Sequence, residues 1–293
     1  MQILKSKKEH LPQIKALWTE VFDDGTEGFC EFLFSVTSTE DIYIVIENDE
    51  VASMLIAVTD VEYKDKKGFY LYSACTGDKY RNRGYMRELI EFAINDQKSR
   101  GKVFCVLQPA SESLFDFYQK IGFDNVIDIR KCNIDIKKNI WRTAEFDIMT
   151  ASRFSAVREK YYKEKMIQYT SKSWEKFAQY LYTFGGSTAE TDNAYAVYYV
   201  EDGILKISEL LAESSFYAMN LLQAISDRTG CEKAEVYLPR DSDLFLGEGK
   251  KEKRYAVRDL SEDVYINLMF EWFVWTLINC SDICSTNVIQ YKS

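Results

Sequence analysis

The residues with the clearest chemical potential form a basic loop in an otherwise acidic chain. The segment 79–87 holds four basic residues and no acidic one, although the formal net charge of the chain is −9. Alternating apolar residues at 69–74 predict a buried strand before the loop, and apolar residues at helical spacing follow Gly84. A helix N-terminus after such a loop presents unpaired backbone N–H groups and the positive end of the helix dipole. The segment therefore predicts a phosphate-binding site, although many such loops bind nothing.

A second motif follows one strand later. Residues 102–108 predict a strand, and residues 111–122 predict an amphipathic helix that ends at a glycine. The two motifs, with a helix and a strand between them, read Arg81-Asn82-Arg83-Gly84-Tyr85-Met86 and Phe117-Tyr118-Gln119-Lys120-Ile121-Gly122-Phe123. They resemble the pyrophosphate loop, Arg/Gln-x-x-Gly-x-Gly/Ala, and the second signature, Leu-Tyr-x-Lys-x-Gly-Phe, of the GNAT superfamily of N-acetyltransferases. The strand pattern extends this resemblance to residues 1–137.

The resemblance implies a fold, a co-substrate and a reaction. The fold would be α/β (α+β), with a mixed, mostly antiparallel sheet flanked by helices. The co-substrate would be acetyl-coenzyme A, and an amine would attack its thioester directly, without a covalent enzyme intermediate. Tyr118, at the family's tyrosine position, would protonate or hydrogen-bond the departing thiolate. Cofactor contacts would come from Ala74, Cys75, Thr76, Arg81, Asn82, Arg83, Gly84, Tyr85, Met86 and Ser111, with backbone N–H groups near Cys75 and Thr76 stabilising the oxyanion.

Two positions depart from the family pattern. Met86 replaces the small residue that usually ends the loop, and Ser111 stands where many members carry an asparagine. These departures leave a second hypothesis open, in which the protein is a non-catalytic acyl-coenzyme A sensor or interaction module. Retention of Arg81, Gly84 and Tyr118 together favours an enzyme, although Tyr118 could also be a core aromatic residue.

The other candidate chemical groups have plain structural alternatives. An acceptor amine must lose a proton, and Glu27 and Glu31 on a predicted second helix at 25–35 are candidate bases or ordinary solvated acids. Cys75 lacks a histidine partner, because His10 is the only histidine in the chain, so packing is expected rather than nucleophilic attack.

Composition limits the classes of protein that this chain can be. Its 37 basic and 46 acidic residues disfavour nucleic-acid binding and suit an amine acceptor, although solubility alone could explain the balance. Seven cysteines without a framework pattern indicate a reducing compartment, and no metal site is expected. The N-terminus has no signal-peptide core, and the apolar run at 264–278 contains Glu271 and is too short to span a membrane. We therefore expect a soluble, cytoplasmic protein without membrane partners, with its oligomeric state left open.

At 293 residues the chain fits two domains, and the order of expected elements occurs twice. We predict a catalytic acetyl-coenzyme A-binding domain at 1–140 and a degenerate GNAT-like domain at 141–293. The loop at 211–215 has neither glycine nor a basic residue, so one cofactor per chain is expected. Tandem proteins of this kind include the enhanced-intracellular-survival acetyltransferases, whose additional sterol-carrier-like domain does not fit this length. The second half would form one side of an aromatic, partly acidic acceptor pocket with Trp174, Tyr195, Tyr198 and Tyr199, which would favour bulky cationic amines, although these residues could equally belong to the core.

Individual elements follow from periodicity and turn residues. In the first half we expect a helix at 10–22, a strand at 2–4, strands at 41–47 and 51–58 joined by a turn at Asn48-Asp49, and closing strands at 123–135. In the second half we expect a strand at 146–151, helices at 152–166, 171–184 and 214–227, and a strand at 233–239. We also expect strands at 194–200 and 204–210 joined by a hairpin turn at Glu201-Asp202-Gly203, and a final strand pair at 254–257 and 264–270.

Overall fold

The computed structural model describes residues 1–22, 34, 37–137, 145–150, 152–162, 165–183 and 185–267. The predicted helix at 25–35, with the candidate bases Glu27 and Glu31, lies outside these residues, apart from position 34.

The first half contains the elements that the sequence predicts. In chain order they are β1 (Gln2–Lys5), α1 (Leu11–Phe22), β2 (Ile42–Glu47), β3 (Glu50–Tyr63), β4 (Lys66–Thr76), α3 (Tyr85–Ser99), β5 (Phe104–Leu107), α4 (Glu112–Gln119) and β6 (Asn125–Asp135). The predicted turn between β2 and β3 is confirmed, with φ values of 52° at Asn48 and 63° at Asp49. Positive φ at both central residues is the requirement of a type I′ turn, whose twist matches that of the flanking strands.

The second half differs from the sequence expectation in four places, one of which is the strand at 187–190 that the sequence did not predict. Its elements are α5 (Arg153–Tyr162), β7 (Met166–Tyr169), α6 (Ser171–Thr183), β8 (Ser187–Glu190), β9 (Ala194–Glu201), β10 (Ile204–Ala212), α7 (Ser215–Thr229), β11 (Lys233–Pro239), β12 (Lys250–Arg258) and β13 (Tyr265–Ile266). The strand expected at 146–151 is only a single bridge between Asp147 and Glu190. The helix expected to reach residue 166 is shorter, and a strand, β7, begins there. The expected final pair was wrong, because β12 pairs with β5 and β6 while β13 pairs with β7.

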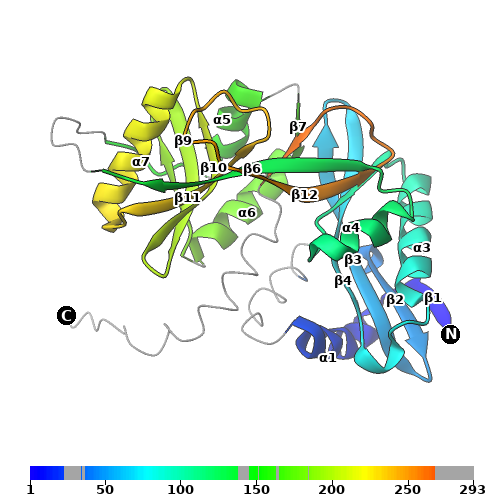
Figure 1. The fold of residues 1–293 in the computed structure, drawn as a ribbon. Helices are drawn as coiled ribbons and strands as arrows, with labels where there is room; N and C mark the ends of the chain where they lie inside the picture. Colours follow the sequence, from blue (N-terminus) through cyan, green and yellow to red (C-terminus); the bar gives the residue numbers. More distant parts are fainter. Residues whose placement is uncertain are drawn as a thin grey trace, which may run out of the picture.

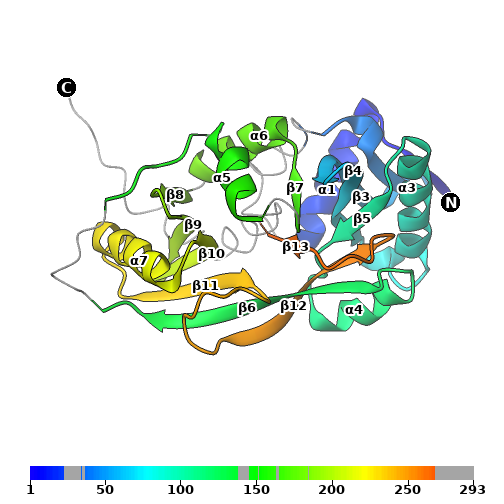
Figure 2. The ribbon, with the colours of Figure 1, turned by 90° about the horizontal axis from the view of Figure 1, so that it is seen from above.

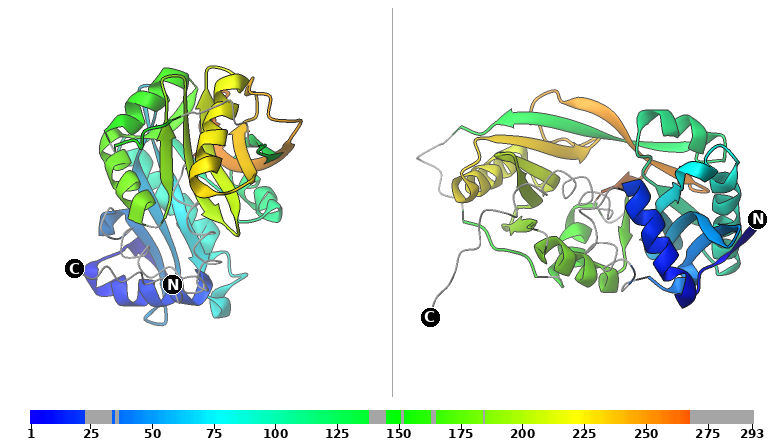
Figure 3. Two further views of the ribbon diagram at one scale, coloured as in Figure 1. Left: turned by 90° about the vertical axis from the view of Figure 1, so that its left-hand side faces the viewer. Right: turned by 90° about the horizontal axis from the view of Figure 1, so that it is seen from below.

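One mixed, mostly antiparallel sheet runs through both halves. Its strand order is β1-β2-β3-β4-β5-β12-β6-β11-β10-β9-β8, with β7 joining β3. Figure 1 shows the long strands β6 and β12 crossing from one half to the other, and Figure 3 shows the same pair from below. Strand β12 therefore supplies the position between β5 and β6 in the first half, although it lies far away in the sequence. The division at residue 140 stays a proposal, since the sheet continues across it.

Helices cover the two faces of the sheet in three packed groups (Figure 2). The helices α3 and α4 pack on the first half, where Leu89, Ile90, Phe115 and Tyr118 join one core. Helix α7 packs on the second half in a separate core. The helices α1, α5 and α6 contribute to a core that contains residues of both halves, so this packing joins them. Apolar burial of this extent is the main stabilising contribution to the arrangement.

The helices of the described residues are short and amphipathic. The two longest, α3 and α7, have 15 residues each, and no described helix is long and apolar enough to cross a membrane.

Candidate functional site

The candidate site begins where the parallel strands β4 and β5 separate. They pair in register from Gly68 with Phe104 to Leu71 with Leu107. Strand β5 ends there, and its chain turns through Pro109 into α4, whereas β4 continues to Thr76. The last five residues of β4 therefore have no β5 neighbour, which opens a gap between the two strands.

A β-bulge in β4 lies at the start of this gap. On the neighbouring strand Met54 pairs with Cys75 and Ile56 with Tyr72, so Leu55 alone stands opposite Ser73 and Ala74. Ser73 has a φ of 53°, in the left-handed region that is uncommon for residues other than glycine. A bulge leaves one residue outside the regular ladder and redirects its neighbours. Here it directs the Ser73 and Ala74 segment toward the gap.

An apolar cavity of about 250 Å³ fills the space beside the bulge. Its lining comes from α1, β4, α3, the end of β5 and α4, and comprises Trp18, Val21, Phe22, Leu71, Tyr72, Ser73, Ala74, Ile90, Leu107, Gln108, Ala110, Leu114 and Tyr118. The hydroxyl of Ser73 and the amide oxygen of Gln108 are buried here, and neither has a hydrogen-bond partner among the described residues. Buried polar atoms are normally paired. These two atoms can therefore receive a polar group of a ligand that enters an otherwise apolar cavity.

The predicted phosphate loop lies after β4 and before α3. Its residues Arg81 to Gly84 are exposed, and Gly84 is the N-cap of α3 with a φ of 82°. A Cβ at Gly84 would have nothing within 4 Å, so open space lies above the first turn of the helix. Asn82 also has a positive φ, of 61°. The backbone thus forms the exposed turn at a helix N-terminus that suits an anion.

The basic side chains of the loop are held mainly by local contacts. Arg81 forms an ion pair of 2.8 Å with Asp78 and donates to the carbonyl oxygen of Thr76 at 3.3 Å. Arg83 donates to the carbonyl oxygen of Lys79 at 3.1 Å. Lys79 pairs with Glu50, and this hydrogen bond lowers the pKa of the Glu50 carboxyl. Because exposed pairs of this kind contribute little, Arg81 and Arg83 can exchange them for a phosphate.

Tyr118 lies on α4 with its ring in the core and against the apolar cavity. Its ring packs edge-on against Phe117 and Phe123, with centroid distances of 5.1 and 5.7 Å. Tyr118 lines the same cavity as Ser73 and Ala74. The structure thus brings the predicted catalytic hydroxyl and the bulged strand to one cavity, and the core-aromatic description of the ring holds at the same time.

The other predicted cofactor-binding residues described next do not line the apolar cavity. Cys75 is buried, and burial raises the pKa of its thiol well above the usual range. This agrees with an inert thiol. The hydroxyl of Ser53 donates to the Cys75 carbonyl oxygen at 2.9 Å and lies 2.8 Å from the Thr76 hydroxyl. Tyr85 and Met86 pack into the core beside α3, so their backbone rather than their side chains faces the loop. Ser111 is exposed at the start of α4, outside the apolar cavity.

The second half repeats this geometry without its opening. The parallel strands β10 and β11 pair from Leu205 to Ile207, and a bulge follows at Ser208. The side-chain amide of Asn267, which is 2% exposed, donates to the Ser208 carbonyl oxygen at this bulge. The following turn enters α7 through Ser214, whose hydroxyl accepts from the backbone N–H of Tyr217. In this half, therefore, side chains of the protein itself form hydrogen bonds at both the bulge and the helix N-terminus.

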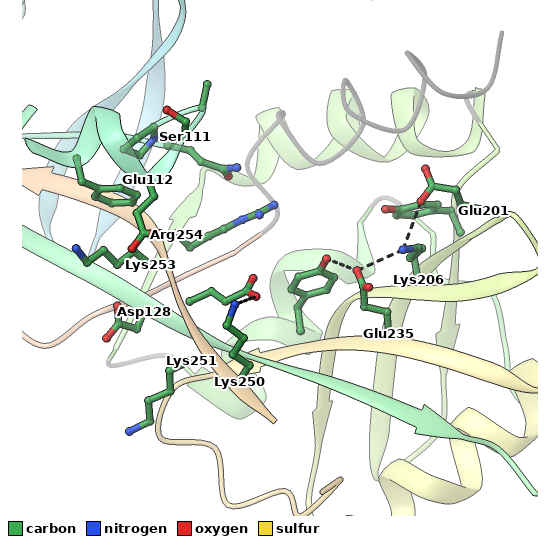
Figure 4. A pocket seen from close by; sticks show the side chains of 17 residues that line it. Ser111, Glu112, Asp128, Glu201, Lys206, Glu235, Lys250, Lys251, Lys253 and Arg254 are labelled. Carbon is green, nitrogen blue, oxygen red and sulfur yellow. Dashed lines mark hydrogen bonds and ion pairs between the residues drawn. The ribbon is translucent and has the colours of Figure 1, made fainter. Parts of the chain in front are cut away.

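A second cavity, of about 820 Å³, adjoins the first and is lined by both halves (Figure 4). Gln108 and Ala110 line both cavities, so the two meet at the end of β5. The remaining lining comes from the start of α4, from β6 and β12, and from β9 to β11: Pro109, Ser111, Glu112, Phe115, Asp128, Tyr199, Glu201, Lys206, Glu235, Tyr237, Lys250, Lys251, Glu252, Lys253 and Arg254. This volume falls in the range of small-molecule sites.

The aromatic side predicted for the acceptor pocket was largely wrong. Trp174, Tyr195 and Tyr198 are buried in the cores and line neither cavity. Only Tyr199 lines the large cavity, together with Tyr237, which the sequence did not single out. Neighbouring residues of β9 point to opposite faces of the sheet, and other parts of the protein pack on both faces. Tyr195 and Tyr198 are therefore buried, although they point in opposite directions.

Sequence reasoning also missed Ser73, Gln108 and the basic run of β12. A serine in an apolar strand and a glutamine before a proline are weak signals by themselves. The run Lys250-Lys251-Glu252-Lys253-Arg254 was a readable signal, because it is a second basic cluster in an acidic chain. Among the described residues, no group of histidine, cysteine or acidic side chains could hold a metal ion.

Comparison with known proteins finds a family model that matches the part of the chain containing the loop and Tyr118. Residues 2–126 match the family model described as an acetyltransferase (GNAT) domain. A GCN5-related N-acetyltransferase from Kribbella flavida has a TM-score of 0.68 and 14% identity over 87% of this chain and 70% of its own. A protein of the same description from Sphaerobacter thermophilus has a TM-score of 0.52 and 15% identity over 90% of this chain and 98% of its own. No curated protein matches the sequence.

Residues 2–126 are therefore similar to a GNAT acetyltransferase domain, and the chain has a GNAT fold. Another similar structure is that of Eis1 from Mycobacterium abscessus, with a TM-score of 0.64 and 12% identity over 88% of this chain and 73% of Eis1. GNAT acetyltransferases use acetyl-coenzyme A, so the domain supports acetyl transfer in general.

Proposed function

We propose that this protein is an acetyl-coenzyme A-dependent N-acetyltransferase that acts on a small-molecule or peptide amine. The observation that carries the proposal is the apolar cavity between β4 and β5, which Ser73 and Tyr118 both line. The exposed loop at Gly84 begins α3 after the same strand. A long thiol-ended cofactor with a pyrophosphate needs these two environments, one apolar and one rich in backbone N–H groups.

The residues divide the binding of acetyl-coenzyme A between them. The backbone from Arg81 to Met86, with the side chains of Arg81 and Arg83, would bind the pyrophosphate. The bulged segment from Ala74 to Thr76 would bind the thioester end, where its backbone N–H groups stabilise the negative charge that develops on the carbonyl oxygen. Ser111, which lies on the side of the large cavity, would contact the cofactor only where the two cavities meet.

The reaction is a direct transfer. The amine nitrogen forms a bond to the acetyl carbonyl carbon, the C–S bond breaks, and the thiolate takes a proton from the Tyr118 hydroxyl. The amine nitrogen releases one proton to water before it attacks and a second as the amide forms, and this second proton restores the Tyr118 hydroxyl. The first release is needed because an alkyl amine with a pKa of about 10.4 is only about one part in a thousand neutral at pH 7.4. The apolar lining supports the transfer because water is excluded from the thioester.

The test combines binding with turnover. Acetyl-coenzyme A should raise the melting temperature of the full chain, and the double variant Arg81→Ala with Gly84→Glu should abolish this shift. An amine panel should then release free coenzyme A thiol, which a thiol reagent measures. A full shift in the double variant would place the cofactor elsewhere. Cofactor binding without thiol release for any amine would support the sensor hypothesis instead.

A further inference from the structure

The large cavity adjoins the predicted acetyl-transfer site, so its charges bear on the choice of acceptor. Its lining contains five acidic and five basic side chains. The chain as a whole has nine more acidic than basic residues. The lining of the cavity therefore has no formal net charge, whereas the chain as a whole is acidic.

The acidic side chains of the cavity are mostly neutralised by basic partners. Lys206 lies 3.3 Å from Glu235 and 3.4 Å from Glu201. Glu235 also pairs with Lys131 at 2.9 Å and accepts a hydrogen bond from Tyr237. Burial alone would raise the pKa of the Glu235 carboxyl, but these hydrogen bonds lower it overall. The Glu235 carboxyl is therefore held ionised, and both Glu235 and Glu201 already have a lysine partner.

Partners from outside the cavity extend this neutralisation. Asp128 pairs with Arg240 at 3.7 Å. Neither Arg240 nor Lys131 lines the cavity. Because these two external cations neutralise acids of the lining, the basic side chains of the lining are in excess.

The excess positive charge lies on β12, beside the end of β5. Lys253 forms no ion pair with the described residues, and its ammonium group lies 5.6 Å from the centre of the Phe115 ring. Lys250 has one contact of 3.5 Å, with Glu252, and its side chain is 81% exposed. Arg254 follows on the same strand and also lines the cavity. In Figure 4 a dashed line marks the ion pair of Lys250, and Lys253 lies near Glu112 at the start of α4.

The junction with the apolar cavity supplies a complementary group. The Gln108 amide oxygen is buried, has no partner among the described residues, and belongs to a residue that lines both cavities. An amide oxygen accepts hydrogen bonds from an amine or ammonium group. A ligand that extends from this junction to β12 would place its amine next to the thioester and its other end among the lysines.

We propose that the acceptor is an amine that also carries an anionic group, a carboxylate or a phosphate, which Lys250 and Lys253 bind in the large cavity. This inference rests on the proposed function and names the acceptor class of that same site. It departs from the bulky cationic amine that the sequence favours, because four of the five acidic side chains of the lining, all except Glu112, already have basic partners.

The experiment compares matched amines with and without an anion. γ-Aminobutyrate is paired with butylamine and phosphoethanolamine with ethanolamine, and spermidine represents cationic amines. Calorimetric binding to the full-length protein is measured with coenzyme A present and absent, and kcat/KM is measured for acetyl transfer. The anionic member of at least one pair should bind and react about 10-fold better, as hydrogen bonds to charged groups allow. The two pairs distinguish a carboxylate from a phosphate.

Two double variants test whether Lys250 and Lys253 bind the anionic group. Lys250→Gln with Lys253→Gln should weaken binding of the anionic amine by about 10-fold and change the neutral amine less than about twofold. The matched control is Lys67→Gln with Lys233→Gln, two exposed strand lysines outside the cavity, and it should leave both amines unchanged.

Two results would overturn the inference. One is equal or better binding of butylamine, ethanolamine or spermidine than of both anionic amines. The other is equal loss in the cavity variant and the control. Failure of the proposed function looks different, because acetyl-coenzyme A would then neither stabilise the protein nor be consumed with any amine, whereas anionic amines could still bind in calorimetry.

Discussion

Substituting Gly84 with alanine tests the predicted pyrophosphate site with the smallest possible change. Gly84 has a φ of 82°, and an added Cβ would meet nothing within 4 Å. The variant therefore creates no clash within the described residues. Its effects would come from backbone strain and from the methyl group in the space above the helix N-terminus, where a phosphate is expected.

The size of the effect follows from the backbone. A residue with a Cβ in the left-handed region costs roughly 1–2 kcal/mol relative to its preferred conformation. Since each 1.4 kcal/mol is about tenfold in an equilibrium constant, the fraction of molecules with the native loop falls by about 5- to 30-fold if the loop relaxes. The apparent Kd for coenzyme A should rise by the same factor, because only the native loop binds.

A matched control separates binding from stability. Gly101, just beyond the other end of α3, has a φ of 84° and also has nothing within 4 Å of an added Cβ. Gly101→Ala should carry a similar strain, so both variants should melt a few degrees lower, at about 2–4 °C per kcal/mol. Only Gly84→Ala should bind coenzyme A more weakly in calorimetry. Equal affinities of the two variants would refute the assignment of the loop as the pyrophosphate site.

Three further outcomes follow from the same geometry. Tyr118→Phe should keep coenzyme A affinity, since the ring contacts persist, but lose about 10- to 1,000-fold in kcat; unchanged kcat with chemistry rate-limiting would leave Tyr118 as a core residue only. Calorimetry should find one coenzyme A per chain, because Asn267 donates to the bulge carbonyl of Ser208 in the second half, and a stoichiometry of two would contradict this. Burial, opposed by Arg158, raises the pKa of Glu209 from 4.5 to about 7, so the stability that this carboxyl contributes is present below about pH 4.5 and is lost as the pH rises toward 7. The free energy of unfolding, measured by urea denaturation, should therefore fall by at most about 3 kcal/mol between pH 5 and 8, and Glu209→Gln should remove this fall. An identical pH dependence in both proteins would show that Glu209 does not titrate in this range.

Local patterns predicted most of the elements of this protein. The turn at Asn48 and Asp49, the helix that begins after Gly84 and the hairpin between β9 and β10 all lie where short-range rules place them. The four-residue strand β7 was missed because it follows α5 closely and is too short for its periodicity to be distinguished from helix. The predicted final strand pair was wrong because each strand has its partner elsewhere in the chain.

The candidate site likewise contains features that local sequence motifs predicted and features that they did not. The basic loop with Gly84 and the segment containing Tyr118 are contiguous motifs, so their residue types and spacing alone indicated phosphate binding and the family. Ser73 acquires its significance only from a bulge, and Gln108 only from its position between two cavities. Neither a bulge nor a cavity has a reliable signature in one strand, because both depend on the register of neighbouring strands.

The sequence by itself predicted the local features, namely a turn suited to an anion and a tyrosine on the next helix, because these depend on residues a few positions apart. Only the tertiary structure decided which cavity Tyr118 shares with the bulged strand and which residues line the adjoining cavity. Strand β12 is more than 100 residues from β5 along the chain, yet it lies between β5 and β6, so that Lys250 and Lys253 line the same cavity as Gln108. Pairing over such separations depends on the burial of two faces at once, and no local periodicity records it.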